Sequence, residues 1–410
     1  MTARWEAQGA RRGLVALVAV VALVAACSSG NGASSPTTAS TSSPSSPGSS
    51  TTTAGPGQPV AGMPPIVDPT NVYSEAGVGM VLARIKDEPH RVYVPNGTSD
   101  TVSVIDPSTY KVIETIPAGR QPQHIVVSYD MRTLWELNDK GQSLMPIDPA
   151  TGKAGPTISV RDPYNLYFTP DGKEAVVVAE ALRMLDYRDP HTMKLHESLH
   201  VTDCEGINHS DYSARGDYAI FTCEFNGKLA KVDVLGKKVL GYVDLGPNAM
   251  PQDVRVAPDG RTFYVADMAA GGVHVLDGDT FKVTGFIPTG VGTHGLNPSR
   301  DGKVLYISNR GSSMIHGTSH GPGSVSVLDF ATKKVIATWP VPGGGSPDMG
   351  NITADGTQLW LSGRYDSEVY VFDLVHGGLL HRIHVGGGPH GLAVWPIPGR
   401  VSFGHTGNTR

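Results

Sequence analysis

A short run of alternating apolar residues that ends in Asp occurs seven times in this sequence, from residue 91 onward. Such alternation is typical of a β-strand with one buried face, and a repeat of about 40–50 residues is typical of propeller blades with four short strands. The repeat therefore predicts an all-β fold, a seven-bladed β-propeller of four-stranded antiparallel blades. The runs end at Asp106, Asp148, Asp186, Asp233, Asp277, Asp329 and Asp373, with spacings of 42, 38, 47, 44, 52 and 44 residues.

Tight-turn residues recur between the first two strands of the repeats. Asp-Gly suits the positive φ that two-residue hairpins need, so each occurrence predicts the hairpin that joins an inner strand to the next one. The pair occurs at Asp171-Gly172, Asp259-Gly260, Asp301-Gly302 and Asp355-Gly356, and Arg215-Gly216 and Asp130-Met131 stand at the same place in two further repeats.

The first and last repeats are incomplete, and this bears on how the ring closes. The repeat at Arg91 begins with a second strand, whereas the last inner strand, 391–395, has no third strand after it. Pairing 391–395 with the first repeat would leave no open sheet edge, which is the usual reason for such closure. The segment 77–84 (GVGMVLAR) is an alternative inner strand, and the sequence leaves both open.

The N-terminal residues have the pattern of an export signal. Arg11 and Arg12 precede an apolar run, 14–26, that is shorter than the roughly 20 residues of a membrane span. The run ends in small residues before Cys27, which resembles the bacterial lipobox. We therefore expect 1–27 to be a lipoprotein signal peptide and Cys27 to be lipidated, which anchors the protein at the extracytoplasmic face of the cell membrane. An ordinary signal peptide is the alternative, and Sec and Tat export both remain open.

Composition divides the remainder into two parts. Residues 28–66 are rich in Ser, Thr and Pro with few large apolar residues, which predicts a disordered linker, and 67–410 should form the propeller. The net charge of −5 comes without a basic stripe, which argues against nucleic acid as a partner.

Once Cys27 is assigned to lipid, Cys204 and Cys223 remain. In an oxidising compartment they suggest a disulfide, with two free thiols or a soft-metal site as alternatives.

The inner strands of a propeller begin at one end of the central channel, and alignment on the hairpins places polar residues there in every blade. We expect these residues to form a ligand-binding channel mouth. The alternative is that they pair with backbone N–H groups and water. The predicted ligand-binding residues are Gln123, His124, Asn165, His209, Gln252, Asp253, His294, Asp348 and His390, and the candidate metal ligands are His124, His209, His294 and His390.

The loop after each second strand should open on the same face and add a second polar ring. A Gly- and Ser-rich insertion between Asp277 and Asp329 carries His316 and His320, and insertions in repeats often lie on the binding face. His405 ends RVSFGH (400–405), a stretch that mirrors RVYVPN (91–96), which ends in Asn96. The second ring consists of Asn96, Asn138, Glu180, Glu224, Asp267, Asn309 and Arg364.

The stretch RVYVPNGTSDTVSVIDPSTYKVIETIPAG (91–119) resembles the YVTN-type repeat of seven-bladed propellers, and the resemblance extends over 91–396. It implies the fold, but no single activity, because that family spans many exported proteins. The repeat is more distantly similar to the propellers of nitrous-oxide reductase and haem-binding nitrite reductase, which would imply copper or haem as cofactor. Asn165, Gly295 and Met349 interrupt a ring of histidines, and no CxxCH motif for an attached haem is present.

These features favour binding over catalysis. Ser210 and Asp211 adjoin His209, but successive side chains alternate across a strand, so they do not form a triad. We expect a membrane-anchored binding or scaffold module that holds a protein or small molecule at the polar face around its channel. A redox-cofactor protein that holds haem or copper is the alternative.

Overall fold

The computed structural model describes residues 58–410. The predicted signal peptide, Cys27 and residues 28–57 of the predicted linker lie outside the described residues. Val60 already donates a backbone hydrogen bond to the carbonyl of Arg215, so contact with the propeller begins within the predicted linker. The described part contains one helix, the 3-10 turn η1 (Ser74–Ala76), and no helix there is long and apolar enough to cross a membrane.

Seven four-stranded antiparallel sheets confirm the predicted architecture. From the inner to the outer strand, blade 1 is β28 (Ala393–Trp395), β1 (Arg91–Asn96), β2 (Thr101–Asp106) and β3 (Lys111–Pro117), and blade 2 is β4 (Pro122–Val127), β5 (Leu134–Asn138), β6 (Ser143–Ile147) and β7 (Ile158–Ser159). Blade 3 is β8 (Pro163–Phe168), β9 (Ala175–Ala179), β10 (Met184–Arg188) and β11 (Leu195–His200), and blade 4 is β12 (Ile207–Tyr212), β13 (Ala219–Cys223), β14 (Lys228–Asp233) and β15 (Lys238–Asp244).

The other three blades follow the same order. Blade 5 is β16 (Pro251–Val256), β17 (Thr262–Asp267), β18 (Gly272–Asp277) and β19 (Lys282–Pro288). Blade 6 is β20 (Thr293–Pro298), β21 (Val304–Asn309), β22 (Ser324–Asp329) and β23 (Lys334–Pro340), and blade 7 is β24 (Pro347–Ile352), β25 (Gln358–Gly363), β26 (Glu368–Asp373) and β27 (Leu379–His384).

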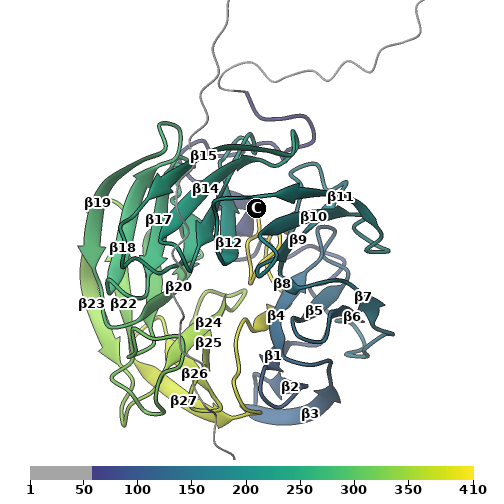
Figure 1. Cartoon of the computed structure of the whole chain (residues 1–410). Coiled ribbons are helices and arrows are strands. Elements are labelled where there is room, and N and C mark those ends of the chain that lie inside the picture. The colour runs from purple at the N-terminus through teal and green to yellow at the C-terminus, as the bar shows by residue number, and fades with distance from the viewer. Residues whose placement is uncertain (1–57) are drawn as a thin grey trace, which may run out of the picture. The chain divides into compact units, whose positions relative to one another are not determined.

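The blades surround a central axis, and the chain closes the ring with its last strand (Figure 1). Strand β28 pairs with β1, with Val394 opposite Val92, so 391–395 supplies the inner strand of blade 1. The alternative segment 77–84 forms turns and no strand. Closure in this way covers the edge of β1 that would otherwise stay unpaired.

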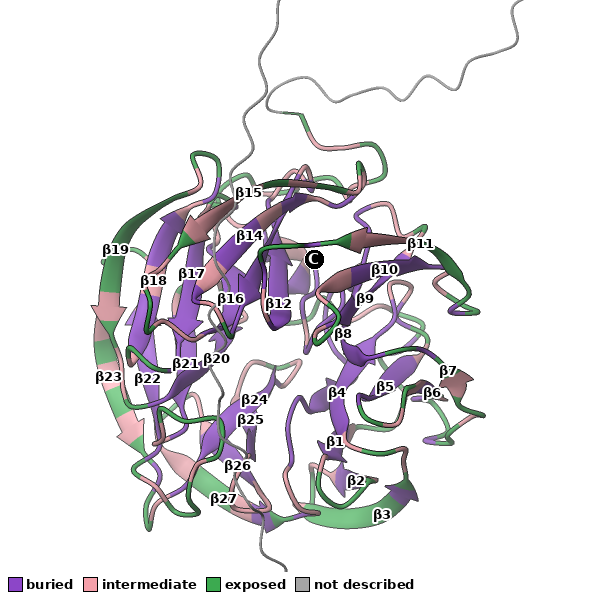
Figure 2. Ribbon diagram, in the orientation of Figure 1, coloured by how far each residue is buried: buried purple, intermediate pink, exposed green. Residues whose placement is uncertain are grey.

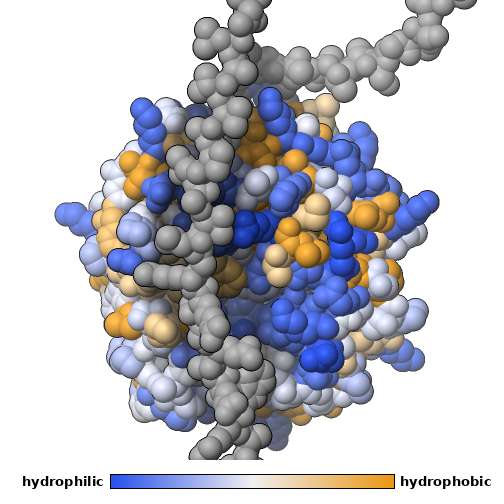
Figure 3. All heavy atoms as spheres, in the orientation of Figure 1, coloured by the Kyte–Doolittle hydropathy of each residue, from blue (hydrophilic) through white to orange (hydrophobic). Residues whose placement is uncertain are grey.

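The core is divided among the seven interfaces between adjacent blades. Seven clusters of buried apolar side chains occur, one per interface; in one of them Val126 and Leu137 of blade 2 meet Leu166 and Phe168 of blade 3. Full burial of such a side chain contributes about 1.5–3 kcal/mol. Outer strands such as β3 and β19 are largely exposed (Figure 2). In the view of Figure 3, hydrophilic residues predominate to the right of the grey trace, with apolar residues scattered among them.

The hairpins have the expected backbone, but one strand end differs from its prediction. Gly172 has φ of 68° and Met131, at the corresponding turn of blade 2, has φ of 54°. In six blades the landmark Asp accepts hydrogen bonds from the turn after the third strand. In blade 3 that residue is Asp189, because β10 continues past Asp186 to Arg188. Asp186 is instead a buried ion-pair residue.

Residues 399–410, which we call the plug segment, enter the ring from the end where the inner strands finish. The backbone N–H of His405 donates to the carbonyl of Leu166 at 2.8 Å, and the N–H of Phe168 donates to the carbonyl of Phe403 at 3.1 Å. Arg410 Nη2 lies 3.0 Å from Asp211 Oδ1. The segment is drawn in yellow inside the ring in Figure 1. It fills the end of the channel where the inner strands finish.

Candidate functional site

A β-bulge at the start of the inner strand positions the channel residues of blades 2 to 7. In each of these blades the register with the second strand shifts at this point, for example between Ile207 and Ser210, where His209 lies. A bulge takes residues out of the ladder and redirects their side chains. Four of these six strands begin with Pro, which has no N–H to place in a ladder. The bulges explain why residues spaced along the whole chain converge.

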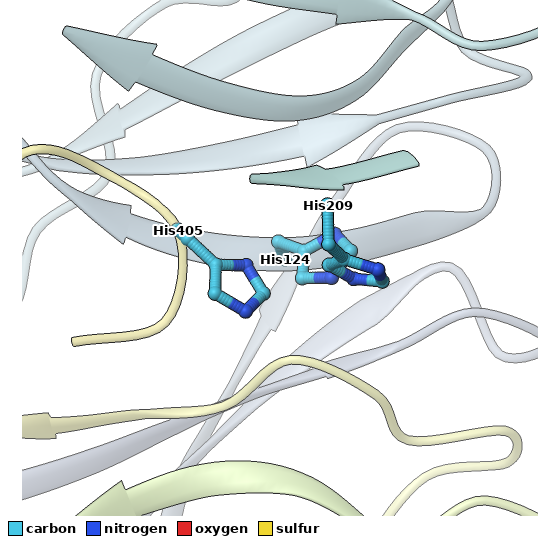
Figure 4. A group of neighbouring side chains, drawn as sticks. All are labelled: His124, His209 and His405. Atoms are coloured by element: carbon cyan, nitrogen blue, oxygen red, sulfur yellow. The ribbon is translucent and has the colours of Figure 1, made fainter. Parts of the chain in front are cut away.

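Five buried imidazoles meet where these bulges converge. The ring centroid of His209 is 5.5 Å from that of His124 and 4.8 Å from that of His405. The ring of His390 lies 4.6 Å from His124 and 5.7 Å from His294. Figure 4 shows His124, His209 and His405 grouped together, with His405 reaching in from the yellow segment. All four candidate metal ligands therefore lie together, joined by a fifth histidine.

A buried ion pair adjoins the histidines. Arg310 donates to both carboxylate oxygens of Asp348, from Nε at 2.9 Å and from Nη2 at 3.0 Å. His294 Nδ1 lies 2.8 Å from Asp348 Oδ1, and His390 Nε2 lies 3.5 Å from Oδ2. Burial alone would raise the pKa of Asp348, but Arg310 and the two histidines hold that pKa well below its ordinary value. Asp348 is therefore a permanent carboxylate matched by one guanidinium.

The histidines themselves are held neutral. Burial lowers the pKa of His124 to about 4, because the charged imidazolium loses its hydration inside the channel. Burial likewise lowers the pKa of His209, His294, His390 and His405. Neutral imidazoles offer a lone pair to a metal ion and a single N–H to an acceptor.

Above the histidines, a pocket of about 350 Å³ forms the mouth of the channel. All seven blades contribute to its wall, and the buried side chains of His294 and His390 are part of it. The polar lining residues are Thr98 of blade 1, Gln121, Gln123, Asp139 and Lys140 of blade 2, Tyr164 and Glu180 of blade 3, Glu224 of blade 4, Gln252 of blade 5, His294, Arg310 and His316 of blade 6, Arg364 and Tyr365 of blade 7, and His390 before β28.

The charges in this pocket do not cancel. Within residues 58–410, no carboxylate lies within ion-pair distance of Arg364, whose guanidinium contacts Gln123 Oε1 at 3.4 Å. Burial lowers the pKa of Arg364 and raises the pKa of Glu180 and Glu224. The charge of Glu224 adds to the rise at Glu180, whereas Gln252, Arg310, Asn208 and Arg364 oppose the rise in the pKa of Glu224. The pocket thus holds an uncompensated cation facing carboxyl groups that resist ionisation.

The insertion of blade 6 covers one side of the pocket. Ile315, His316 and Gly317 line it, and the Tyr365 hydroxyl donates to the carbonyls of Met314 and Ile315 at 2.9 Å each. His320, in contrast, is turned toward the outside of blade 7, where its backbone N–H donates to Asp366. One of the two insertion histidines therefore lies at the pocket.

The predicted channel residues divide into two levels. Gln123, Gln252, His294 and His390 line the pocket, whereas His124 and His209 lie beneath it. Two other predicted residues, Asn165 and Asp253, form hydrogen bonds within the protein. Asn165 Nδ2 contacts His405 Nδ1 at 3.0 Å, and Asp253 accepts from the backbone N–H groups of Val254 and Leu296 at 2.9 Å each.

The second polar ring is only partly formed. Glu180, Glu224 and Arg364 line the pocket, as expected. The other four residues end their second strands but do not line the pocket, because they are buried and bond within their own blades. Asn96, for example, donates to Thr101 and Ser103. Asn138 donates a hydrogen bond to Glu136, and Asn309 donates to Ser324 and Ser326. The Asp267 carboxylate is hydrogen-bonded to His274.

Cys204 and Cys223 are joined by a disulfide, with their Cα atoms 4.8 Å apart. The bond links the turn before β12 to the end of β13. These segments flank the bulge that carries His209, so the disulfide braces the blade at the channel.

Two important residues were not among the predicted site residues. Arg310 is the residue directly after Asn309. The only feature of the sequence that points to it is its place as the basic residue at the start of the insertion. His405 was noticed only because RVSFGH mirrors an earlier strand. The structure instead places it in the plug segment, a part of the chain without repeat periodicity.

Comparisons with known proteins agree with this fold. A family model described as YNCE-like beta-propeller matches residues 55–398, whereas no curated protein matches the sequence. Hydrazine synthase of Kuenenia stuttgartiensis is similar with a TM-score of 0.57 and 20% identity, over 68% of this chain and 91% of that chain. A functionally unknown protein from Desulfotomaculum acetoxidans DSM 771 has a TM-score of 0.58 and 15% identity, over 74% and 98%.

A third solved structure, dihydro-heme d1 dehydrogenase NirN in complex with DHE, has a TM-score of 0.55 and 13% identity. It covers 80% of this chain and 82% of that chain. At such identities these likenesses concern the fold alone.

Proposed function

Because the chain belongs to the YNCE-like β-propeller family, we propose that it is a lipid-anchored binding protein of the extracytoplasmic membrane surface. Its ligand is a small anionic solute held in the mouth of the channel. The anchor is the lipidated Cys27 expected from the sequence, and the linker after it gives the propeller reach.

The observation that carries this proposal is the uncompensated guanidinium of Arg364 in a pocket to which every blade contributes. A planar guanidinium binds carboxylate or phosphate through two parallel hydrogen bonds. Glu180 and Glu224, whose pKa values burial raises, can donate hydrogen bonds to the same anion while protonated. The closed ring keeps these groups in place before the ligand arrives, which lowers the cost of binding.

Calorimetric titration of the full chain tests this function. The probes are succinate and inorganic phosphate, with glucose as an uncharged probe. We expect one of the anions to bind, and Arg364→Gln to weaken that binding by at least about tenfold, since a charge-assisted hydrogen bond contributes about 1.5–3 kcal/mol. Arg132→Gln, at an exposed site outside the pocket, is the matched control. Glucose binding alone, or equal anion binding by Arg364→Gln, contradicts the proposal.

A haem-binding function is the second candidate. His390 in the wall of the pocket favours it, since its Nδ1 has no hydrogen-bond partner among the described residues. Haem supplied in the growth medium should then give the purified chain a Soret absorbance that His390→Ala removes. A colourless chain after haem supply and reconstitution leaves only the anion-binding candidate.

A further inference from the structure

Three of the channel histidines come from distant parts of the chain and present their nitrogens to one another. His124 is the third residue of β4, His209 is the third residue of β12, and His405 belongs to the plug segment. One ring nitrogen of each lies within 4.8 Å of the other two, and all three side chains are buried (Figure 4). The fold therefore assembles this group only when the ring has closed and the plug segment has entered it.

The hydrogen bonding of the group is incomplete. Among the described residues, neither ring nitrogen of His209 has a partner, and Nε2 of His124 has none. A neutral imidazole carries one donor and one acceptor nitrogen, and leaving such an atom buried without a partner costs about 1–3 kcal/mol. Unpartnered nitrogens of two imidazoles beside a third point to a ligand that binds all three.

The remaining nitrogens have the partners that metal-bound histidines commonly have. His124 Nδ1 lies 2.9 Å from the backbone carbonyl of Tyr164, which accepts its proton and leaves Nε2 as a lone-pair donor. His405 Nε2 lies 3.3 Å from Asp253 Oδ1. Hydrogen bonds from a ligating imidazole to a carbonyl or carboxylate fix its tautomer and raise its basicity.

We propose that His124, His209 and His405 bind one divalent transition-metal ion, Cu²⁺ or Zn²⁺, beneath the pocket. Imidazole sets suit these ions, and Cu²⁺ should bind more tightly than Zn²⁺ at the same ligands. Metal–nitrogen bonds of about 2.0–2.1 Å require the three rings to rotate closer together. If Nδ1 is the ligating atom of His405, its hydrogen bond with Asn165 must also break. The site lies beyond the proposed anion pocket and does not depend on it.

The neighbouring group of His294, Asp348 and His390 also has metal-ligand spacing, but its charges disfavour an ion. Arg310 already occupies both oxygens of Asp348, and its Nη2 lies 3.4 Å from His390 Nε2. A metal ion there would have to displace a guanidinium from its carboxylate. This difference assigns the ion to the histidine group that contains the plug residue.

Elemental analysis of the full chain tests the site. The chain is stripped with a chelator, titrated with CuSO₄ or ZnCl₂ and passed over chelating resin. We expect one ion per chain, and a loss of affinity of at least about 100-fold in His405→Gln and in His209→Gln, since even partners behind the ligands contribute 10–100-fold. His376→Gln, at an exposed histidine on blade 7, is the control and should bind like the wild type.

Digestion of the wild type by carboxypeptidase gives a second measurement that does not depend on whether a variant folds. Metal bound to His405 should slow the removal of the plug segment, because the ion holds that segment in the ring. Three outcomes overturn the proposal: no stoichiometric metal in the wild type, unchanged affinity in a folded His405→Gln, or digestion that metal does not slow. Loss of metal in His294→Gln with full retention in His405→Gln would move the ion to the Asp348 group.

Discussion

Asp348 and Glu180 are both carboxyls in the channel, yet their environments act on them in opposite ways. Asp348 receives two hydrogen bonds from Arg310, which outweigh the loss of hydration and keep the carboxylate charged. Among the described residues no cation lies within ion-pair distance of Glu180, so burial and the charge of Glu224 raise its pKa. At the residue scale, the partner of a buried group and not its burial alone decides its charge.

Asp162, the residue before β8, allows the effect of burial on a carboxyl group to be measured. Burial raises its pKa to about 6, with Asp139 adding to the rise and Lys140 opposing it. Because the proton binds the folded form more strongly, this group favours folding below pH 4, and the contribution is lost as the pH rises through 6. We expect the wild type to lose about 1 kcal/mol more than Asp162→Asn between pH 4 and 7, since solvent screens part of the shift.

Urea unfolding of both proteins at several pH values measures this difference. Asn tolerates the positive φ of this position, 45°, and can keep the hydrogen bond from the backbone N–H of Leu182. Parallel pH curves for the two proteins would show that Asp162 has an ordinary pKa in the folded protein.

At the scale of the element, the bulged inner strand is the unit that makes the channel. Its first residues leave the ladder, and the remainder of the strand stays paired and buried. In blade 4 the disulfide between Cys204 and Cys223 fixes the turn before the strand to the end of β13. The blade that carries His209 is thus held covalently at its channel end.

Removal of that disulfide should lower the stability of the protein. The bond closes a loop with a sequence separation of 19 residues, for which the loss of unfolded-state entropy corresponds to about 3 kcal/mol. We expect a decrease of this size in the free energy of unfolding when both cysteines are changed to Ser, measured by urea unfolding. Wild type with dithiothreitol should approach the variant. A midpoint unaffected by either treatment means that the bond does not constrain the unfolded chain.

The repeated elements could be predicted from the sequence, because alternation and turn residues are local properties of each strand and hairpin. Local patterns also have limits. The run that ends at Asp186 predicts the end of a strand, but β10 runs on to Arg188, and Asp189 accepts the hydrogen bonds of the turn. The ring closure could not be predicted from local patterns, because it depends on which distant strand pairs with β1. The position of His405 could not be predicted either, because its segment is placed by contacts with several blades.

At the scale of the whole molecule, the plug segment connects blades that share no interface. Ser402 bonds to the carbonyl of Val127 in blade 2, and Asn351 of blade 7 donates to the carbonyl of Thr406. Asp211 of blade 4 accepts from Arg410 and from Asn408. Contacts of this kind resist separation of the blades, because opening the ring at any interface must also release the plug segment.

Arg410→Met should therefore destabilise the whole ring. The change leaves Asp211 buried without its cation, which costs about 3–5 kcal/mol, whereas Arg132→Met, at an exposed arginine, should stay within about 0.5 kcal/mol of the wild type. The described tryptophans lie in blades 1, 2, 6 and 7, away from Asp211 in blade 4. If the plug segment joins the blades, tryptophan fluorescence and far-UV circular dichroism shift to the same lower urea midpoint. An early loss of circular dichroism with an unchanged fluorescence midpoint would instead show that blade 4 unfolds alone.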